Sequence, residues 1–96
     1  MSVIARRDVF QVIADATHRK IISMIIKEPL NLNAIAAKFD ISRPAVSPHI
    51  KILEECGMAS IQQNGGERYV EARLQQLNEV VSWVEKYRKI LGKNIR

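Results

Sequence analysis

Cysteine and histidine are scarce in this chain, and their scarcity argues against disulfide-stabilised, metal-binding and catalytic proteins. A single cysteine, Cys56, cannot form an internal disulfide, and the only histidines, His18 and His49, lie too far apart for a metal-ligand pair of helical or loop spacing. We therefore expect no bound metal and no other cofactor. So few reactive groups also leave no Ser/His/Asp, Cys/His or paired-carboxylate set, and we do not expect an enzyme.

Long apolar runs are absent as well. Runs such as residues 24–26 are too short to span a bilayer or to act as a signal peptide, so we expect a soluble, cytoplasmic protein without a membrane partner. With 96 residues, of which 47% are hydrophobic and 5% aromatic, the chain has enough material for one small core of aliphatic side chains. Residues 1–96 are therefore predicted to form a single domain.

The formal net charge of +5 invites a nucleic-acid interpretation, but its location matters more than its size. Residues 1–85 hold equal numbers of basic and acidic side chains, so the whole excess comes from residues 86–96. A basic run at the end of a helix is commonly a solvated surface, because cations are favoured at a helix C-terminus. The placement of individual basic side chains must therefore carry the functional argument.

Hydrophobic periodicity and capping residues predict a mainly helical fold with one small hairpin. Apolar residues at helical intervals predict a first helix over 3–14, and Asp15 can cap a second helix that Glu28-Pro29 ends. Asn31 or Asn33 can cap a third helix through residue 39, and Ser42 can cap a fourth that ends at Gly57. Strands over 58–63 and 67–72 flank Asn-Gly-Gly and predict a hairpin, and residues 74–91 form one long last helix. Two helices joined by a turn and followed by a hairpin predict a winged helix-turn-helix.

The helix-turn-helix at residues 33–56 is the sharpest feature, and its expected buried positions are Ile35, Ala36, Ile41, Val46, Ile50 and Leu53. On the outer side of the fourth helix, Arg43 and Ser47 occupy the first turns and Lys51 follows one turn later, while Arg68 lies on the wing. A small, polar helix N-terminus of this kind fits a DNA major groove about 12 Å wide. The alternative is a winged-helix module that docks on another protein without DNA sequence specificity, because the fold alone does not decide function.

Three segments resemble one family of repressors over nearly the whole chain. "DVFQVIADATHRKIISMI", "ISRPAVSPHIKILEECGM" and "NGGERYVEA" are similar to the second helix, recognition helix and wing of the ArsR-type winged-helix repressors. The ending "LNEVVSWVEKYRKIL" further resembles a metal-independent branch, and the metal-ligand patterns of other branches are missing, since "LNLNAIAAKF" lacks cysteine and residues 74–96 lack histidine. The resemblance implies a homodimer, joined through its first and last helices, that binds an inverted repeat in double-stranded DNA and represses transcription.

The candidate site residues follow from the pattern and the resemblance together. Arg43 and Ser47 are expected to meet base edges, and Thr17, Arg19, Lys51 and Arg68 to hold phosphates. The full set of expected DNA-binding residues is Thr17, Arg19, Ser42, Arg43, Pro44, Ser47, Pro48, His49, Lys51, Gln63 and Arg68. The expected dimer interface comprises Val9, Phe10, Ile13, Val80, Trp83, Val84, Tyr87 and Leu91.

Several of these residues have two interpretations. His18 is expected to be an exposed surface residue, and His49 borders the core, where packing or capping is as plausible as a base contact. Trp83 and Tyr87 fit an interface core more readily than a ligand pocket. Cys56 is expected to be a small buried hydrophobe. Pro44 suits a first helical turn, where no N–H is needed. Pro48 removes a hydrogen bond from the helix interior. Either the proline tilts the first turn of the helix for DNA readout, or it is a product of sequence drift in a protein with weak or altered specificity.

Overall fold

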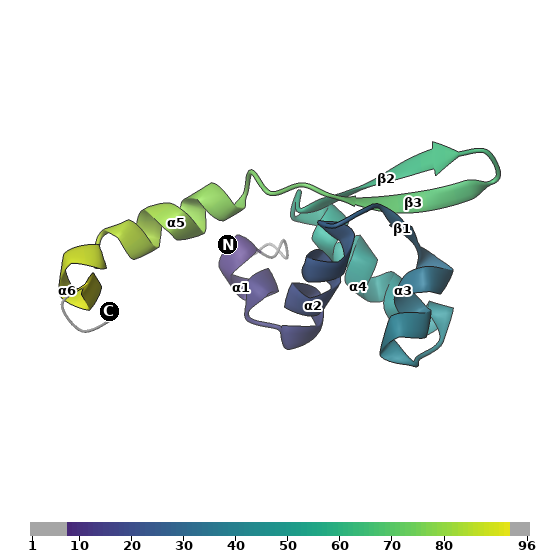
Figure 1. Ribbon diagram of the computed structural model, residues 1–96, viewed down its shortest axis with the longest axis horizontal. Coiled ribbons are helices and arrows are strands. Elements are labelled where there is room, and N and C mark those ends of the chain that lie inside the picture. Colours follow the sequence, from purple (N-terminus) through teal and green to yellow (C-terminus); the bar gives the residue numbers. More distant parts are fainter. Residues whose placement is uncertain (1–7, 93–96) are drawn as a thin grey trace, which may run out of the picture.

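The computed structural model describes residues 8–92, and within them the chain forms a helical body, a β wing and a C-terminal helical arm (Figure 1). The elements in chain order are α1 (Val9–Ile13), α2 (Ala16–Ile25), β1 (Leu30–Asn31), α3 (Leu32–Phe39), α4 (Arg43–Glu55), β2 (Ala59–Asn64), β3 (Glu67–Ala72), α5 (Leu77–Glu85) and α6 (Arg88–Gly92). This order confirms the predicted winged helix-turn-helix. No helix among residues 8–92 is long and apolar enough to cross a membrane.

Side-chain caps set the starts of the first four helices. Asp8 forms a capping box with Gln11 ahead of α1, so the described helix begins later than the expected residue 3, and residues 1–7 lie outside the described part. Asp15, Asn31 and Ser42 each accept a hydrogen bond from a backbone N–H in the first turn that follows. These three caps confirm the predicted helix starts and fix the register of the helix-turn-helix.

Two residues with positive φ end the two helices of that motif. Asp40, with φ of 57°, closes α3, and the Ile41 N–H donates to the Ala36 carbonyl at 3.1 Å. Gly57, with φ of 80°, follows α4 as the capping pattern predicts. A β-carbon at Gly57 would also lie 3.3 Å from the Gln76 side-chain nitrogen, so both the backbone angle and the space favour glycine.

The wing is a hairpin with a third, unexpected strand beside it. β2 and β3 pair antiparallel from Ala59 opposite Ala72 to Asn64 opposite Glu67, as predicted. β1 pairs with the other edge of β3, which makes the strand order β1-β3-β2. The two residues of β1 are too few to show the alternation by which a strand is recognised in sequence. This short pairing joins the wing to the start of α3.

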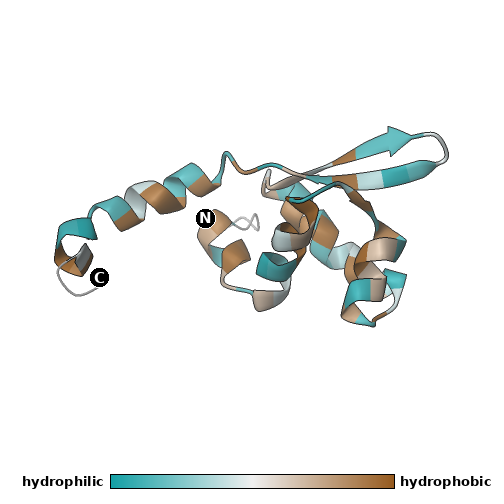
Figure 2. Cartoon of the chain, viewed as in Figure 1, coloured by the Kyte–Doolittle hydropathy of each residue, from teal (hydrophilic) through white to brown (hydrophobic). Residues whose placement is uncertain are grey.

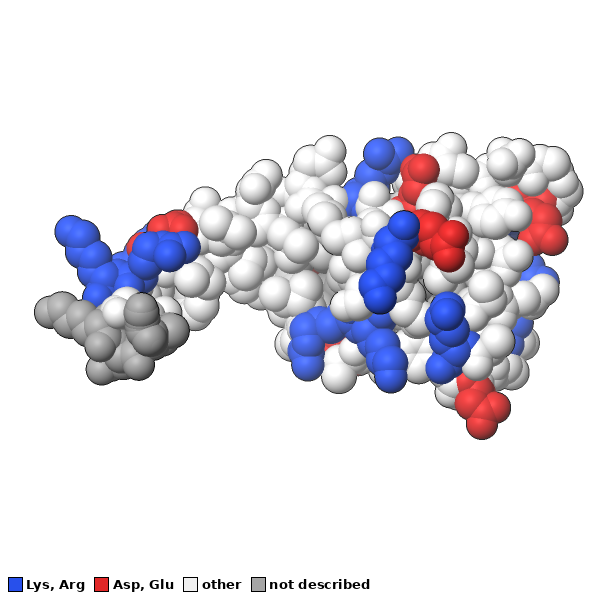
Figure 3. All heavy atoms as spheres, in the orientation of Figure 1, with Lys and Arg blue, Asp and Glu red and all other residues white. Residues whose placement is uncertain are grey.

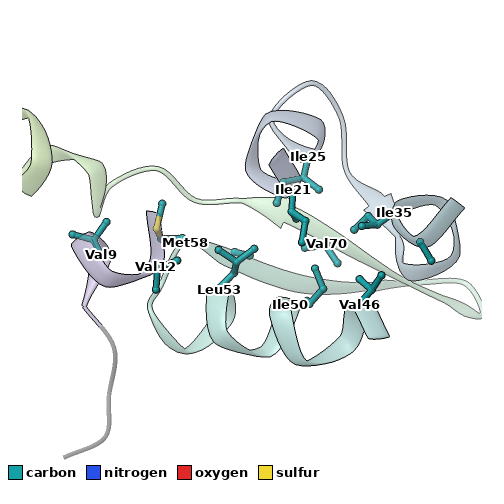
Figure 4. Close-up of a cluster of buried hydrophobic side chains, with 12 residues drawn as sticks. Val9, Val12, Ile21, Ile25, Ile35, Val46, Ile50, Leu53, Met58 and Val70 are labelled. Atoms are coloured by element: carbon teal, nitrogen blue, oxygen red, sulfur yellow. The ribbon is translucent and has the colours of Figure 1, made fainter. Parts of the chain in front are cut away.

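The core lies between the helices and the inner face of the sheet (Figure 4). Val46, Ile50 and Leu53 project from one side of α4 toward Ile21 of α2 and Val70 of β3, and all five are buried. Ile35 and Ala36 of α3 are buried as expected. Ile41 was expected there too, but it is 41% exposed, because it belongs to the turn after Asp40 and not to a helix face.

The C-terminal arm differs from the single long helix that the periodicity predicts. The helix is interrupted at Lys86 and Tyr87, whose N–H groups donate to the carbonyls three residues back, at 3.3 and 2.9 Å. α5 contacts α1. Phe10 of α1 packs edge to face against Trp83 of α5, with ring centroids 6.1 Å apart. Beyond this contact the arm leads away from the body, with apolar and polar residues interleaved along it (Figure 2). No residue of α5 or α6 is buried.

Candidate nucleic-acid interface

The N-terminal turns of α4 are the exposed end of the second helix of the motif. Ser42 caps the helix by accepting from the Ala45 N–H at 3.3 Å, and Pro44 occupies a first-turn position where a missing N–H costs nothing. Arg43 and Ser47 are exposed, as expected of residues that face a ligand. This end of α4 therefore offers a solvent-facing surface on a helix whose inner side is locked into the core.

A groove of about 500 Å³ separates α4 from the wing. It brings together four of the expected DNA-binding residues, Ser47, Pro48, Lys51 and Arg68. The remaining lining residues are Leu32, Ile50, Glu54 and Ile61. The groove therefore places residues of α4 and of the wing along one hollow.

A smaller hollow of about 220 Å³ shares Leu32 and Arg68 with the groove. It joins Arg43 of α4 to Gln63 and Arg68 of the wing, so the wing reaches the first turn of the recognition helix. Asn33 and Glu67 also line it, and neither was expected from the sequence. The sequence could have suggested Asn33 as a site residue, because a polar residue just inside a helix N-terminus is often exposed there.

The basic side chains of this surface have acidic residues nearby, since Glu54 lines the groove and Glu67 lines the smaller hollow, but they form no direct ion pair within residues 8–92. Among the ion pairs within residues 8–92, none involves Arg43, Lys51 or Arg68. Glu67 instead accepts a hydrogen bond from the Asn31 side chain at 2.8 Å. Lys and Arg side chains stand out from the helical body in Figure 3, and others lie at the end of the arm. Unpaired cations beside a groove are available to phosphate oxygens.

Thr17 and Arg19 lie at the start of α2 and line neither hollow. The Thr17 backbone N–H donates to Asp15, and the Arg19 guanidinium donates to the Ile13 carbonyl at 2.7 Å. Arg19 thus stabilises the end of α1 through one of its five N–H groups. The structure does not bring these two residues together with the residues of α4 and the wing.

α4 remains helical through Pro48. Its first turn begins with two bonds to the Ser42 carbonyl, from Ala45 at 3.0 Å and from Val46 at 3.3 Å. Pro48 cannot donate to the Pro44 carbonyl, so that acceptor is left without its helical partner. The pyrrolidine ring of Pro48 lines the groove together with Ser47 and Lys51 and adds an apolar surface to it.

His18 is not where the sequence suggested, whereas His49 lies at the border of the core as expected. His18, expected to be exposed, is only 3% exposed, and its Nδ1 lies 3.0 Å from the Val12 carbonyl. Its Nε2 lies 3.1 Å from Nδ1 of the half-buried His49, so residues distant in sequence are in contact. His49 therefore turns one nitrogen inward, which favours a packing role over a base contact. Asp15 lies beside them, and the Thr17 backbone N–H lowers the pKa of its carboxyl.

The expected dimer residues divide into three groups. Val9 is 2% exposed and belongs to the core of its own chain, which leaves little of its surface for a partner. Phe10, Ile13 and Val80 are half-buried against the core. The remaining four are large and exposed, together with two further apolar side chains that were not expected: Val81 53%, Trp83 51%, Val84 37%, Tyr87 44%, Ile90 65% and Leu91 43%.

Comparison with known proteins decides the family. Residues 15–60 match the model of the bacterial regulatory proteins of the arsR family. The chain is also 30% identical over 77 residues to the transcriptional repressor SdpR of Bacillus subtilis, covering 80% of this chain and 86% of that protein. The chain belongs to the ArsR family. It is therefore a DNA-binding transcriptional regulator, from a family of regulators and not of enzymes.

Solved structures of ArsR-family proteins share the fold. An ArsR-like transcriptional regulator from Rhodococcus sp. RHA1 superposes with a TM-score of 0.77 at 22% identity, over 91% of this chain and 80% of that chain. A homodimeric winged helix-turn-helix DNA-binding domain from Mycobacterium bovis superposes with a TM-score of 0.68 at 14% identity, over 92% of this chain and 79% of that chain. These likenesses confirm the ArsR architecture.

Proposed function

We propose that this ArsR-family protein is a homodimeric repressor that binds an inverted-repeat operator in double-stranded DNA. The observation that carries the proposal is the pair of hollows between α4 and the wing, where Arg43, Lys51 and Arg68 form no ion pair with any residue in the described part of the chain. The name of SdpR as a repressor and the homodimeric state of the Mycobacterium bovis domain support the two finer parts of the proposal.

In this proposal the first turns of α4 enter the major groove. Arg43 can donate to guanine O6 and N7, and the Ser47 hydroxyl can contact a neighbouring base edge. Pro48 offers only carbon atoms and suits the methyl group of a thymine. Lys51, one turn further along, and Arg68 and Gln63 on the wing contact the phosphate backbone on either side. Thr17 and Arg19 are proposed as further backbone contacts from the start of α2.

The exposed apolar residues of α5 and α6 supply the dimer contact. They lie on one helical arm beside the half-buried Phe10, and a large exposed apolar patch commonly marks a protein–protein interface. Burying it against a second copy brings two α4 helices into one particle with two-fold symmetry. Two such helices match half-sites about 34–36 Å apart, one turn of B-DNA, and the two-fold symmetry of the dimer requires that these half-sites form an inverted repeat.

A salt series of gel shifts tests DNA binding against docking on another protein. DNA fragments selected from genomic DNA would be compared with shuffled fragments of the same length. Counterion release predicts that log affinity falls linearly with log salt, with a slope of about −0.9 for each phosphate neutralised. Binding without this salt slope, or without preference for the selected fragment, would support the docking module instead.

A further inference from the structure

Asp15, His18 and His49 form a cluster of metal-ligating groups at the junction of α2 and α4. One nitrogen or oxygen atom from each of the three residues lies within 4.8 Å of the others. We propose that the cluster binds one divalent transition-metal ion of the Zn²⁺ class, whose protein ligands include imidazole nitrogen and carboxylate oxygen. The proposal concerns only these side chains and does not depend on DNA binding.

The separation of the two imidazoles fits a shared ion. His18 Nε2 and His49 Nδ1 are 3.1 Å apart, and the rings meet at 71° with their centroids 5.0 Å apart. Two nitrogens on a tetrahedral zinc ion, each about 2.0–2.1 Å from the metal, are separated by about 3.3 Å. The pair therefore needs to open by only about 0.2 Å to receive an ion.

The surroundings of His18 prepare it as a ligand. Its Nδ1 lies 3.0 Å from the Val12 carbonyl, which can only accept, so the ring carries its proton on Nδ1. That tautomer leaves the lone pair of Nε2 directed at His49. A hydrogen bond from the second ring nitrogen to a backbone carbonyl is the usual support of a metal-bound histidine. With only 3% of the residue exposed, packing also holds the ring in place.

Asp15 supplies the third ligand and the negative charge. One carboxylate oxygen caps α2 by accepting from the Thr17 N–H at 2.8 Å, and the other lies 3.9 Å from His18 Nδ1. The side chain is 45% exposed, so this second oxygen can turn toward the imidazoles without displacing the core.

The alternative is that the histidines only hydrogen-bond to each other. Without an ion, the Nδ1–H of His49 donates to Nε2 of His18, and both rings are satisfied. A metal ion would take the position of that shared proton, and the proton of the neutral His49 ring would move from Nδ1 to Nε2. The bound ion would then link the first turn of α2 to the middle of α4 by two coordinate bonds in place of one hydrogen bond.

The test uses the full, untagged chain freed of metal by chelator and titrated with Co²⁺ and Zn²⁺. Since the chain has two histidines, every imidazole signal reports on this site. We expect one equivalent of Co²⁺ to produce the visible absorption of tetrahedral coordination, and one equivalent of Zn²⁺ to shift the ring protons of both histidines in NMR spectra. Absence of saturable binding, or a shift of only one histidine, would overturn the proposal.

Matched variants identify the ligands without unfolding the protein. Asp15→Asn keeps a good helix cap but loses the charged ligand, and Asp8→Asn makes the same change at the cap of α1. We expect Asp15→Asn and the half-buried His49→Gln to weaken Zn²⁺ binding at least about tenfold, since even supporting residues contribute that much. Asp8→Asn and Cys56→Ala should leave it unchanged. Full affinity in Asp15→Asn or His49→Gln, or equal losses in the two asparagine variants, would contradict the assignment.

Discussion

Arg43 and Arg68 line the same hollow, but Arg43 belongs to a helix packed on the core and Arg68 to a projecting hairpin. Arg43 is the first residue of α4, and the side of that helix that faces the protein is anchored by Val46 and Ile50. Arg68 lies near the tip of the hairpin, in a pair with Gln63, where both residues are exposed. An arginine fixed on a buried helix can meet one base with defined geometry, whereas one on a projecting hairpin is suited to the uniform phosphate backbone.

This difference leads to a paired prediction. Arg43→Ala should reduce discrimination at one base position of each half-site by about 1–3 kcal/mol. Arg68→Ala should weaken selected and shuffled DNA to a similar extent and reduce the salt slope by about one. Gel shifts against single-base variants of the operator measure both effects. If the loss in Arg43→Ala were independent of sequence, Arg43 would not be a base reader.

The histidines show what residue-level inference from sequence could not reach. The pattern placed His49 at the border of the core, and the structure agrees. It did not reveal that His18 is buried, because that follows from how α2 crosses α4 and from the position of the Val12 carbonyl. Periodicity reports which face of one helix is apolar, but not which polar atoms from two helices meet.

At the scale of elements, the two ends of α4 were predictable from the sequence, whereas its interior holds an unusual residue, Pro48. Ser42 and Gly57 bound the helix as their cap chemistry requires, and the wing follows from Asn-Gly-Gly between two strands. β1 was not predictable, because two residues carry no period. The interruption between α5 and α6 was not predictable either, since the apolar spacing continues through Lys86 and Tyr87.

Pro48 gives the prediction that belongs to this element. An interior proline costs a helix about 3 kcal/mol relative to alanine, so Pro48→Ala and Pro48→Lys should both raise the free energy of unfolding, by about 1–3 kcal/mol. Urea denaturation measures this gain. If the proline shapes the first turn for DNA readout, both variants should also discriminate less well between selected and shuffled DNA.

The alanine variant separates the effect of the ring from that of an added charge. Pro48→Lys places a cation in the groove beside Lys51, so it should strengthen binding to all sequences, whereas Pro48→Ala should not. Undiminished discrimination between selected and shuffled DNA in both variants would show that the proline has no part in readout and reflects drift.

For the whole molecule, the arm formed by α5 and α6 is hard to explain in an isolated chain. Its contact with the body is limited to the region of Phe10 and to the start of α5, where Leu77 and Val80 are half-buried. Trp83 and Tyr87 contact each other, with ring centroids 5.3 Å apart, yet both remain about half exposed. Apolar surface of this extent is stabilised by removal from water, and a second copy of the same arm presents a matching surface.

The dimer prediction can be tested on α5 with two variants that add the same charge. Val84 lies on the apolar side of the helix and Ser82 on the opposite side, and both are exposed in the single chain. Val84→Asp should therefore shift the dimer toward monomer, because a carboxylate buried without a partner is costly, whereas Ser82→Asp should not. Light scattering should give about twice the 10.9 kDa chain mass for the parent and for Ser82→Asp.

The single tryptophan, Trp83, should move its emission to longer wavelength when Val84→Asp exposes it to water. The same variant should lose affinity for the complete operator but keep most of its weak affinity for one half-site, because each α4 surface is intact. A monomeric parent that still binds the full operator tightly, or equal effects of the two aspartates, would refute an interface on this face of α5.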